Sequence, residues 1–491
     1  MTLPGVFAIS ALLAFQPQAP TPAAPAEAQK GFRPVTAAFH IHTRFSNGAY
    51  DISELAAFAR QRRIDVLGVS DSFLTRVRFG IGPLKKLVSQ TMKRPGVLDR
   101  GVDEYFDSFE RVQQAYPDLV LLPGLEVAPY YYWRGDWRTR LELHDFDRHI
   151  LVFGMRDREA VRNLPVIENE RWANTSHDLL RAAGPLIAFL VALLIGAVGA
   201  AARNRKMYLA AFAIALPALL WSYDAYPFGR FADPYSGKPD IEPFQKVIDY
   251  VAKHGGLTFW SYPEARFPDV LSGRARMISI PHPETLSRTK GYRGFEGLYG
   301  DKITITNPGN LWDQLLMEHL RGAHNPWPSV VTGLDFHFFK PAAGWYELDH
   351  GLTVLFSAAK TEAAVTDALR NGRGYATFQE NPDRRLGIED FALRSNGNVA
   401  ISGETLKAGP EVEFGVSVRW MTGAAEGEGA AAAIQIIRDG SLIERYENKT
   451  PAVLRRRETL APGRHYYRII VDAGVTRILS NPIFCDVSLP N

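Results

Sequence analysis

The feature that most constrains the fold is an uncharged apolar run in the middle of the chain. Residues Gly184 to Ala202 (GPLIAFLVALLIGAVGAAA) are long enough to cross a bilayer as a helix. A second run, Met207 to Tyr223, follows almost at once and includes Trp221 near its end, a residue type that favours the membrane interface. Both runs lack the polar face that helices of soluble domains normally show. The pattern predicts a transmembrane hairpin at 184–223, with two buried core helices as the alternative.

The charges around the hairpin predict its orientation. The connecting turn, Arg203 to Lys206, carries three positive charges, which the positive-inside tendency assigns to the cytoplasm. The apolar run Leu3 to Phe15 and the Pro/Ala-rich stretch behind it make residues 1–30 similar to a secretory signal segment. No Lys or Arg precedes that run, so an uncleaved anchor or a simple tail is the alternative. We expect a protein of the cytoplasmic membrane with the bulk of its chain periplasmic or extracellular.

Composition excludes some functions and sets the number of domains. A chain of 491 residues is expected to form two or three domains. Its net charge of +3 is small and its basic residues are spread along the chain, which argues against nucleic acid as a partner. The single cysteine, Cys485, excludes an intrachain disulfide and most thiolate metal sites.

The order of predicted strands and helices in the rest of the chain indicates an α/β fold class. Between residues 31 and 384, short β-rich runs alternate with helical stretches such as Ile52–Arg63 and Pro243–His254, which predicts a β/α barrel or a parallel sheet that carries the hairpin as an insertion. From 385 to 491 the pattern is strands and turns alone, which predicts a β-sandwich. The strands expected in the first region are Thr36–Ile41, Val66–Ser70, Val120–Leu125, His149–Phe153, Leu257–Ser261, Gly294–Leu298 and Val330–Leu334. Those expected in the second include Val412–Trp420, Ala433–Asp439 and Arg464–Val471.

Two histidines at the end of the first predicted strand suggest a metal. His40 and His42 stand two apart, and such positions on a strand project to the same face. Two imidazoles on one face can hold one cation. Taken alone, the pair is equally consistent with histidines that cap or pack.

The surrounding segments resemble the polymerase-and-histidinol-phosphatase (PHP) family of metal-dependent hydrolases. The resemblance covers residues 35 to 380 apart from the hairpin, and the segments follow the family's order. They are FHIHTRFSNG, DVLGVSDSF, LLPGLEV, HILVFG, HGGLTFWSYPEA and VTGLDFH, with NGRGYATF similar to the family's closing stretch. The resemblance implies a distorted, seven-stranded-type β/α barrel whose metal ligands follow the carboxyl ends of its strands.

The ligands implied by this resemblance are incomplete. Asn47 stands where the family has Asp, Ser72 where it has the His after Asp71, and Tyr262 where it has the His before Pro263. Only the family's first metal keeps its full set, so we expect about one divalent ion per chain. Two imidazoles and two carboxylates suit Zn²⁺, Mn²⁺ or Fe²⁺. The implied ligands that remain are His40, His42, Glu126, His149, Asp335 and His337, of which His40, His42, Glu126 and Asp335 form the complete set.

The resemblance also implies a chemistry. Members typically hydrolyse phosphate esters, so we expect a phosphoesterase acting on a small phosphorylated molecule, with Asp71 activating water and Arg44 binding an oxyanion. A structural carboxylate and a solvated loop arginine are the alternatives for these two residues. Arg76 and Arg78 are further oxyanion candidates, and His282, His144 and Asp145 are candidates for a replacement ligand or supporting contacts. A different hypothesis is an inactive PHP-like domain that binds metal, a ligand or a partner at the membrane, or serves as a scaffold.

Overall fold

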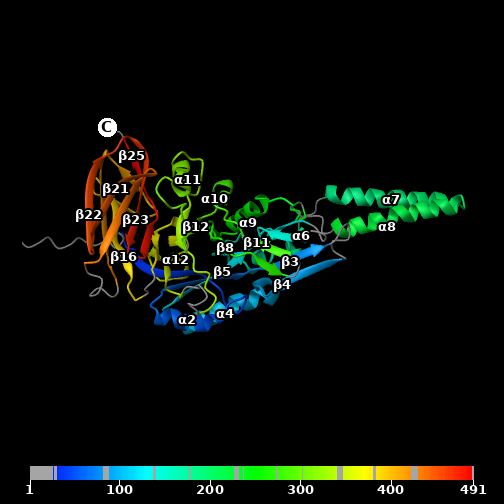
Figure 1. Cartoon of the computed structure of the whole chain (residues 1–491), viewed down its shortest axis with the longest axis horizontal. Helices are drawn as coiled ribbons and strands as arrows, with labels where there is room; N and C mark the ends of the chain where they lie inside the picture. The colour runs from blue at the N-terminus through cyan, green and yellow to red at the C-terminus, as the bar shows by residue number, and fades with distance from the viewer. Residues whose placement is uncertain are drawn as a thin grey trace, which may run out of the picture.

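The computed structural model describes residues 26, 30–80, 88–135, 140–175, 179–225, 232–235, 237–272, 275–300, 302–339, 347–379, 383–421 and 429–488. The signal-like segment predicted at 1–30 lies outside these residues except for Ala26 and Lys30. Figure 1 shows a long molecule with a pair of helices at one end, the C-terminal strands at the other, and a mixed α/β region between them.

One large sheet organises the α/β region. Its strands lie in the order β13-β12-β9-β8-β5-β2-β1-β14-β15, and every strand expected there from the sequence forms. Most of its residues are buried, which explains why these strands read as short apolar runs. The bounds are β1 Arg33–Ile41, β2 Val66–Ser72, β5 Val120–Val127, β8 Ile150–Phe153, β9 Leu257–Trp260, β12 Gly294–Leu298, β13 Ser329–Thr332, β14 Gly351–Ser357 and β15 Gly374–Phe378.

The sheet is mixed and not parallel throughout. β1, β2 and β5 run parallel to one another, as do β9, β12 and β13. β8 is antiparallel to both of its neighbours, β5 and β9, and β14 is antiparallel to β1. Because β8 is reversed, its first residue lies at the same edge of the sheet as the last residues of β5 and β9. A site at this edge can therefore contain residues from the carboxyl ends of β5 and β9 and from the amino end of β8.

The two ends of this strand series approach each other. Ile41 and Phe336 form an isolated parallel bridge, so the segment after β13 lies beside the end of β1. Thr332 of β13 donates its backbone N–H to Thr353 Oγ1 and its hydroxyl to Leu352 O, both on β14. These contacts place β13 beside β1 and β14; closure of the strands into a barrel stays a prediction.

Alternate residues of the strands pack into two different cores. Val35, Ala37 and Phe39 belong to a cluster with the helix α12 (Glu362–Asn371). Ala38 and Ile41 belong to the largest cluster, which also receives the apolar faces of the helices on the other side. Those helices include α2 Ile52–Gln61, α3 Val97–Arg100, α4 Val102–Ala115, α5 Arg158–Arg162, α9 Glu242–Lys253, α10 Thr285–Arg288 and α11 Leu311–Leu320.

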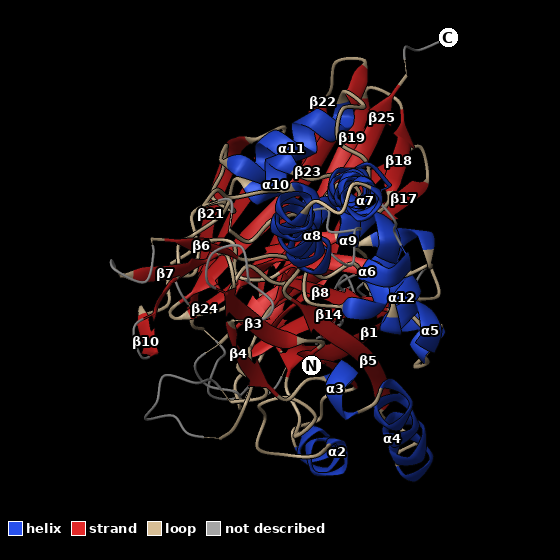
Figure 2. Cartoon of the chain, turned by 90° about the vertical axis from the view of Figure 1, so that its right-hand side faces the viewer, coloured by secondary structure: helices blue, strands red, loops and turns tan. Residues whose placement is uncertain are grey.

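Two small sheets lie toward the end that carries the helix pair. One is the hairpin of β3 (Thr75–Gly80) and β4 (Ser89–Arg94). The other has the order β10-β11-β7-β6, with bounds β10 Val270–Ser272, β11 Ala275–Ile278, β7 Leu141–His144 and β6 Tyr132–Arg134. Figure 2 looks along the helix pair and shows these strands around its base, together with the short helix α6 (Glu170–Thr175).

The two apolar runs form two long helices that lie side by side (Figure 1), α7 (Leu179–Ala201) and α8 (Arg205–Ala225). A side chain on Gly184 would meet the Trp221 ring at 2.9 Å, and one on Gly199 would meet Met207 at 2.8 Å, so both glycines permit close packing of the pair. Within the described residues, one helical stretch, Ala183–Ala201, is long and apolar enough to cross a membrane, and 17% of it is buried. The second span of the hairpin stays a prediction.

The strands after residue 385 form two sheets around a shared apolar cluster. One sheet has the order β17-β16-β19-β22, and the other strands continue the large sheet because β24 pairs with β15. A sandwich requires such a shared core, but its boundary at 385 stays a prediction. The bounds are β16 Leu386–Ser395, β17 Asn398–Ile401, β18 Thr405–Ala408, β19 Glu411–Trp420, β20 Ala431–Arg438, β21 Ser441–Lys449, β22 Ala452–Thr459, β23 Gly463–Ala473, β24 Thr476–Ser480 and β25 Ile483–Val487.

A buried ion pair joins α11 to these strands. Arg468 of β23 donates to both carboxylate oxygens of Asp313 at 2.6 and 2.7 Å, and both side chains are almost fully buried.

We expect Asp313→Ala to lower the free energy of unfolding by about 3–5 kcal/mol, because it leaves the Arg468 charge buried without its partner. Denaturant unfolding of the purified chain measures this. Arg445→Ala, which removes an exposed pair with Glu447, is the control and should cost only about 0–1 kcal/mol; equal losses would contradict the expectation.

Candidate metal centre

Four side chains predicted as one metal set converge at the edge of the large sheet. His40 lies in β1 and His42 just after it, Glu126 lies near the end of β5, and Asp335 follows β13. One ligand atom from each of the four lies within 4.8 Å of the others. The grouping joins residues separated by as many as 295 positions in the chain, and it places them where the strand ends meet.

A backbone connection fixes the late aspartate next to the histidines. Phe336 donates its N–H to His40 O, and His42 donates its N–H to Phe336 O, both at 2.9 Å. His40 and Asp335 have positive φ angles of 63° and 48°. The pairing of β1 with β2 shifts register between Phe39 and Ile41, so a bulge at His40, and not simple alternation along a regular strand, aims the two imidazoles at one point. Unusual backbone of this kind persists where the surroundings enforce it.

Two imidazole nitrogens face two carboxylates inside the cluster. His40 Nε2 lies 3.2 Å from Glu126 Oε1 and 3.4 Å from Asp335 Oδ1. His42 Nε2 lies 3.2 Å from Asp335 Oδ1, yet it is buried and has no hydrogen-bond partner among the described residues. A buried nitrogen without a partner, aimed at ionisable oxygens, is suited to a cation. The donor set therefore fits a divalent metal.

The outer nitrogens of both histidines are held in place. His40 Nδ1 lies 2.8 Å from Glu296 Oε1, and His42 Nδ1 lies 3.1 Å from Ser46 Oγ. A proton on each Nδ1 satisfies these contacts, so both Nε2 atoms would be free to bind a cation; without a cation, His40 Nε2 lies within hydrogen-bonding distance of Glu126. Ser46 Oγ in turn donates to Asp71 Oδ1 at 2.5 Å. Each of the two imidazoles thus has a supporting contact on its far side.

Glu296 is a supporting residue that the sequence patterns did not identify. It is fully buried in β12, and its Oε2 accepts from Ser261 Oγ at 3.0 Å and from the backbone of Tyr262 at 3.1 Å. A Cβ on Gly333 would lie 2.1 Å from its carboxylate, so only glycine leaves room there. The available signal was an acidic residue in the centre of the apolar strand GFEGL.

The charges of the cluster stabilise one another. Burial opposes a charge on His40, but Glu296, Glu126 and Asp335 outweigh it and raise the pKa of His40 well above its usual value. Burial likewise opposes ionisation of Glu126, and the neighbouring His149 outweighs it and lowers the pKa of Glu126 well below its usual value. Asp335 behaves in the same way beside His337. Both carboxylates are therefore ionised, the state that a metal ligand requires.

His149 and His337, also predicted as ligands, flank this set. His149 Nδ1 lies 2.6 Å from Glu126 Oε1, and its Nε2 donates to Phe146 O at 3.1 Å. His149 directly precedes β8 and reaches the cluster because that strand is reversed, so it does not follow a strand's carboxyl end as expected. His337 Nε2 lies 3.0 Å from Asp335 Oδ1, and its ring stacks on His42. Both histidines hold the carboxylates; ligation by them stays a prediction.

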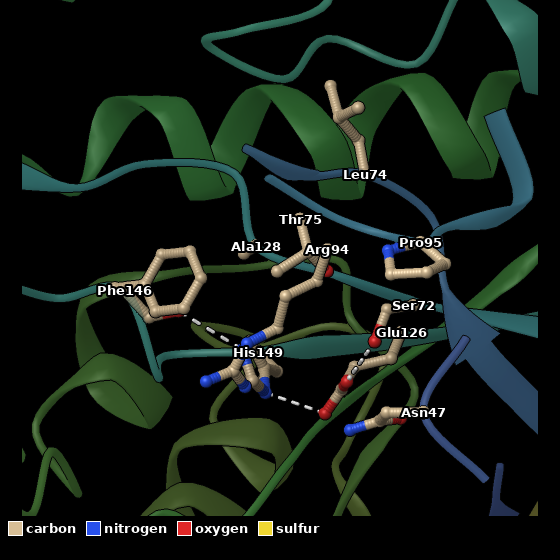
Figure 3. A pocket seen from close by; sticks show the side chains of 10 residues that line it. All are labelled: Asn47, Ser72, Leu74, Thr75, Arg94, Pro95, Glu126, Ala128, Phe146 and His149. Atoms are coloured by element: carbon tan, nitrogen blue, oxygen red, sulfur yellow. Dashed lines mark hydrogen bonds and ion pairs between the residues drawn. The ribbon is translucent and has the colours of Figure 1, made fainter. Parts of the chain in front are cut away.

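A cavity of about 80 Å³ opens beside the cluster (Figure 3). Two of the positions that depart from the family pattern, Asn47 and Ser72, line it, and Ser72 Oγ donates to Glu126 Oε2 at 3.1 Å. The cavity thus joins the metal cluster to the strand end of β2 and to the β3–β4 hairpin. Its lining residues are Asn47, Ser72, Leu74, Thr75, Arg94, Pro95, Glu126, Ala128, Phe146 and His149.

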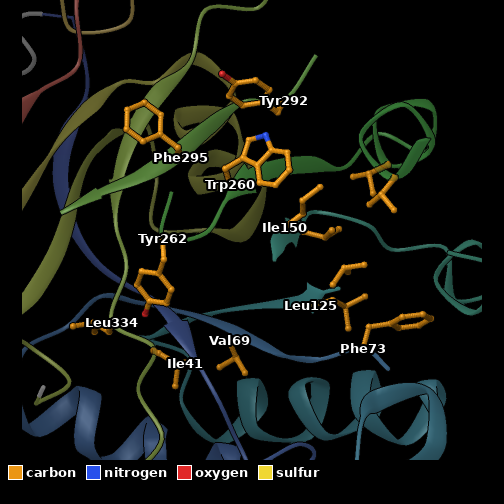
Figure 4. Packing of buried hydrophobic residues seen from close by; sticks show 14 of the residues in the cluster. Ile41, Val69, Phe73, Leu125, Ile150, Trp260, Tyr262, Tyr292, Phe295 and Leu334 are labelled. Carbon is orange, nitrogen blue, oxygen red and sulfur yellow. The ribbon is translucent and has the colours of Figure 1, made fainter. Parts of the chain in front are cut away.

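Tyr262, the third departing position, closes another side of the cluster. Its ring stacks on His40 with centroids 5.0 Å apart. Burial, reinforced by Asp335, raises the pKa of the phenol well above its usual value, so the hydroxyl stays neutral. Figure 4 shows this ring pointing toward Ile41 and Leu334 among buried apolar side chains. Tyr262 therefore fills its position with apolar surface and a neutral hydroxyl.

The residues proposed for catalysis lie outside the cavity lining. Asp71 is fully buried and accepts from Thr43 N at 2.7 Å and Thr43 Oγ1 at 2.6 Å, as well as from Ser46, so it holds the loop that carries His42. Arg44 is half exposed and pairs with Asp51 and Glu54 at the start of α2. Arg76 pairs with Asp99, and Arg78 with Glu168 and Glu170. Catalytic roles for Asp71 and Arg44 stay predictions.

The alternative ligands also lie apart from the four-residue set. His282 is buried beside Trp260, its Nε2 has no partner among the described residues, and burial lowers its pKa to about 3. His144 stacks on Tyr132 and lies 3.2 Å from Glu142. Burial raises the pKa of Asp145 to about 6. None of the three belongs to the cluster that could hold a metal.

Comparisons with known proteins gave matches among solved structures. No protein-family model and no curated protein matches the chain. One structural match is a two-domain protein from Bacteroides vulgatus ATCC 8482 containing a predicted PHP-like metal-dependent phosphoesterase, with 12% identity, a TM-score of 0.38, and coverage of 91% of this chain and 92% of that one. Another is a putative metal-dependent phosphoesterase from Bifidobacterium adolescentis ATCC 15703, with 17% identity, a TM-score of 0.26, and coverage of 62% and 87%. Because both TM-scores are below 0.5, these matches carry no argument about function. Any argument about function has to rest on the metal cluster.

The contact between Glu296 and His40 predicts that Glu296 affects metal affinity. We expect Glu296→Gln to weaken binding of Mn²⁺ or Zn²⁺ by about 10–100-fold, because a neutral amide supports the imidazole less strongly. Calorimetric metal titration of the purified chain measures the change. Glu284→Gln, which alters a half-exposed carboxylate near Arg148, is the matched control and should leave the affinity unchanged.

Proposed function

We propose that this chain is a metal-dependent hydrolase of phosphate esters. One observation carries the proposal: His40, His42, Glu126 and Asp335 converge on one buried point, and His42 Nε2 there has no hydrogen-bond partner among the described residues. Zn²⁺, Mn²⁺ or Fe²⁺ suits this mixed donor set, and we propose one ion per chain.

A bound divalent ion would lower the pKa of a water molecule and neutralise charge on phosphoryl oxygens. The chain's own residues prepare the place for this chemistry. Glu296 and Ser46 orient the two imidazoles, and Asp71 holds Ser46. The cavity beside Glu126 and His149 gives a small substrate access to the cluster. We keep Asp71 and Arg44 as candidate catalytic residues for water and an oxyanion respectively.

The domain arrangement that we propose follows from the same features. Residues 31–384 would form a PHP-like barrel, with the hairpin at 184–223 inserted between β8 and β9, and residues 385–491 a β-sandwich. The contacts of Thr332 with β14 and the bridge of Ile41 to Phe336 support closure of the barrel. The shared apolar cluster of the two C-terminal sheets supports the sandwich.

A second candidate function is a catalytically inactive metal- or ligand-binding protein at the membrane. The observation that favours it is Tyr262, whose neutral phenol and stacked ring occupy one of the positions at which the family resemblance implies a ligand. The four-residue set would then bind a metal for structure or recognition. The two candidates differ in turnover and not in metal content.

Metal analysis and a turnover assay together test the proposal. We expect about one Zn, Mn or Fe per purified chain, loss of that metal in His40→Ala and in Asp335→Ala, and hydrolysis of generic phosphomonoesters or phosphodiesters with Mn²⁺ or Zn²⁺ added. His254→Ala, on the outer end of α9, should retain the metal. Bound metal without turnover would favour the inactive candidate, and a wild-type chain without metal would contradict both.

We further propose that α7 and α8 anchor the protein in the cytoplasmic membrane. Large apolar side chains on both helices are exposed, including Leu190 at 55%, Leu194 at 66% and Phe212 at 66%. Exposed apolar surface on neighbouring helices is disfavoured in water but matches lipid. The charged turn from Arg203 to Lys206 supports a cytoplasmic loop, which would leave the bulk of the chain periplasmic or extracellular.

Replacing lipid-facing residues tests the anchor. We expect Leu190→Lys combined with Leu194→Lys to shift the protein from the membrane pellet to the soluble or aggregated fraction, since each charge costs about 2.5–3.5 kcal/mol or more at the bilayer centre. Fractionation with carbonate washing measures the distribution. Leu442→Lys, at an exposed apolar residue of β21, should leave it unchanged. If the double variant stays in the pellet and is extracted by detergent like the wild type, the anchor lies elsewhere.

A further inference from the structure

Arg94 is the one arginine that lines the cavity beside the metal cluster. It is the last residue of β4, pairs with Thr75 of β3, and shares the cavity with Glu126 and His149. Figure 3 shows its side chain reaching down from the hairpin on the side of His149. A guanidinium therefore stands next to the proposed reaction site.

Because successive side chains of a strand point to opposite faces, Arg94 lies on the other face of the hairpin from the neighbouring cations Arg76 and Lys93. Arg76 and Lys93 face each other across β3 and β4, and both pair with Asp99, at 3.1 and 2.9 Å. Arg94, one residue further, projects to the opposite face. Its side chain makes no hydrogen bond or ion pair with any residue in the described ranges. The charge of Arg94 is thus available to a ligand, while those of its neighbours are not.

The remaining lining of the cavity favours an anion. Asn47 and Ser72 are neutral, and Glu126, the one carboxylate in the lining, is already engaged by His149 and lies in the metal set. Leu74, Pro95 and Phe146 add apolar surface, and Arg94 itself is exposed to solvent. A guanidinium can donate two parallel hydrogen bonds to phosphoryl oxygens.

The cavity has room for a phosphoryl group. Its volume of about 80 Å³ is several times the roughly 10–15 Å³ that one water needs. The rest of an ester would extend past the cavity mouth. The middle of β3 is bonded to β6 and the residue before it, because Tyr131 accepts from Arg78 N at 2.9 Å and Trp133 donates to Arg78 O at 3.0 Å.

From this placement we propose that Arg94 is the residue that binds the phosphoryl anion of the substrate, a role that rests on the proposed hydrolase function. The cation-binding cluster and Arg94 would hold the group from two sides. Arg94 then determines selection for dianionic or monoanionic phosphoryl groups over neutral esters, and it does so without contributing to the metal set.

Phosphate binding tests this assignment without depending on turnover. The probe is inorganic phosphate, titrated calorimetrically into the full chain in detergent after loading with Mn²⁺. We expect Arg94→Gln to weaken phosphate binding about tenfold or more and Arg94→Lys to weaken it less, because a charge-assisted, bidentate contact is lost or reduced. Metal content should be unchanged in both. Lys93→Gln, which alters the adjacent cation on the other face, should bind phosphate like the wild type.

The outcomes separate the failure of each proposal. A wild-type chain without metal contradicts the hydrolase proposal itself. A metal-loaded wild type that binds no phosphate at millimolar concentration, or an Arg94→Gln variant that binds it as well as the wild type does, overturns the role of Arg94. Equal weakening in Lys93→Gln, or loss of metal in Arg94→Gln, would make the residue a general electrostatic or structural element and would overturn the role as well.

Discussion

The two hydrogen bonds between the end of β1 and the segment after β13 are the contacts on which the site depends. The N–H of Phe336 donates to His40 O, and the C=O of Phe336 accepts from His42 N. The backbone that carries the two imidazoles is therefore hydrogen-bonded to the backbone between Asp335 and His337. The metal set thus comes from main-chain geometry before any cation is involved. A metal could then add to the stability of the site without having to create it.

The surroundings of this set differ from one side to the other. Behind it, Glu296 and Asp71 supply buried carboxylates that orient the ligands. Beside it, Tyr262 provides a neutral stacked ring, and Asn47 and Ser72 provide neutral donors at the cavity. The open side therefore combines these neutral groups and some apolar surface with Arg94, next to one compact group of possible metal ligands.

Local sequence patterns were sufficient for most of the elements, whereas the four-residue set followed from the resemblance to a family and not from local pattern. Buried strands such as β2 and β5 are short apolar runs ending in polar residues, and such runs are visible in one sequence. The reversal of β8 and the bulge at His40 were not visible, because both are set by partners far along the chain. Glu296 was missed because a lone acid in an apolar strand gains meaning only when His40, 256 positions away, lies against it. Arg94 was missed for a related reason: only the register of the β3–β4 hairpin distinguishes it from Lys93.

The pairing of β15 with β24 determines how the C-terminal strands can move. Four residue pairs, Tyr375 with Ser480 through Phe378 with Arg477, continue the large sheet from one region into the other. Asn481 also binds both the N–H and the C=O of Val330 in β13. If the C-terminal strands rotated as a separate body, the hydrogen bonds between β15 and β24 and the buried hydrogen bonds of Asn481 with Val330 would have to break together. The two regions are therefore joined at this junction by one continuous sheet, in which β14 alone separates β15 from β1, the strand that carries His40.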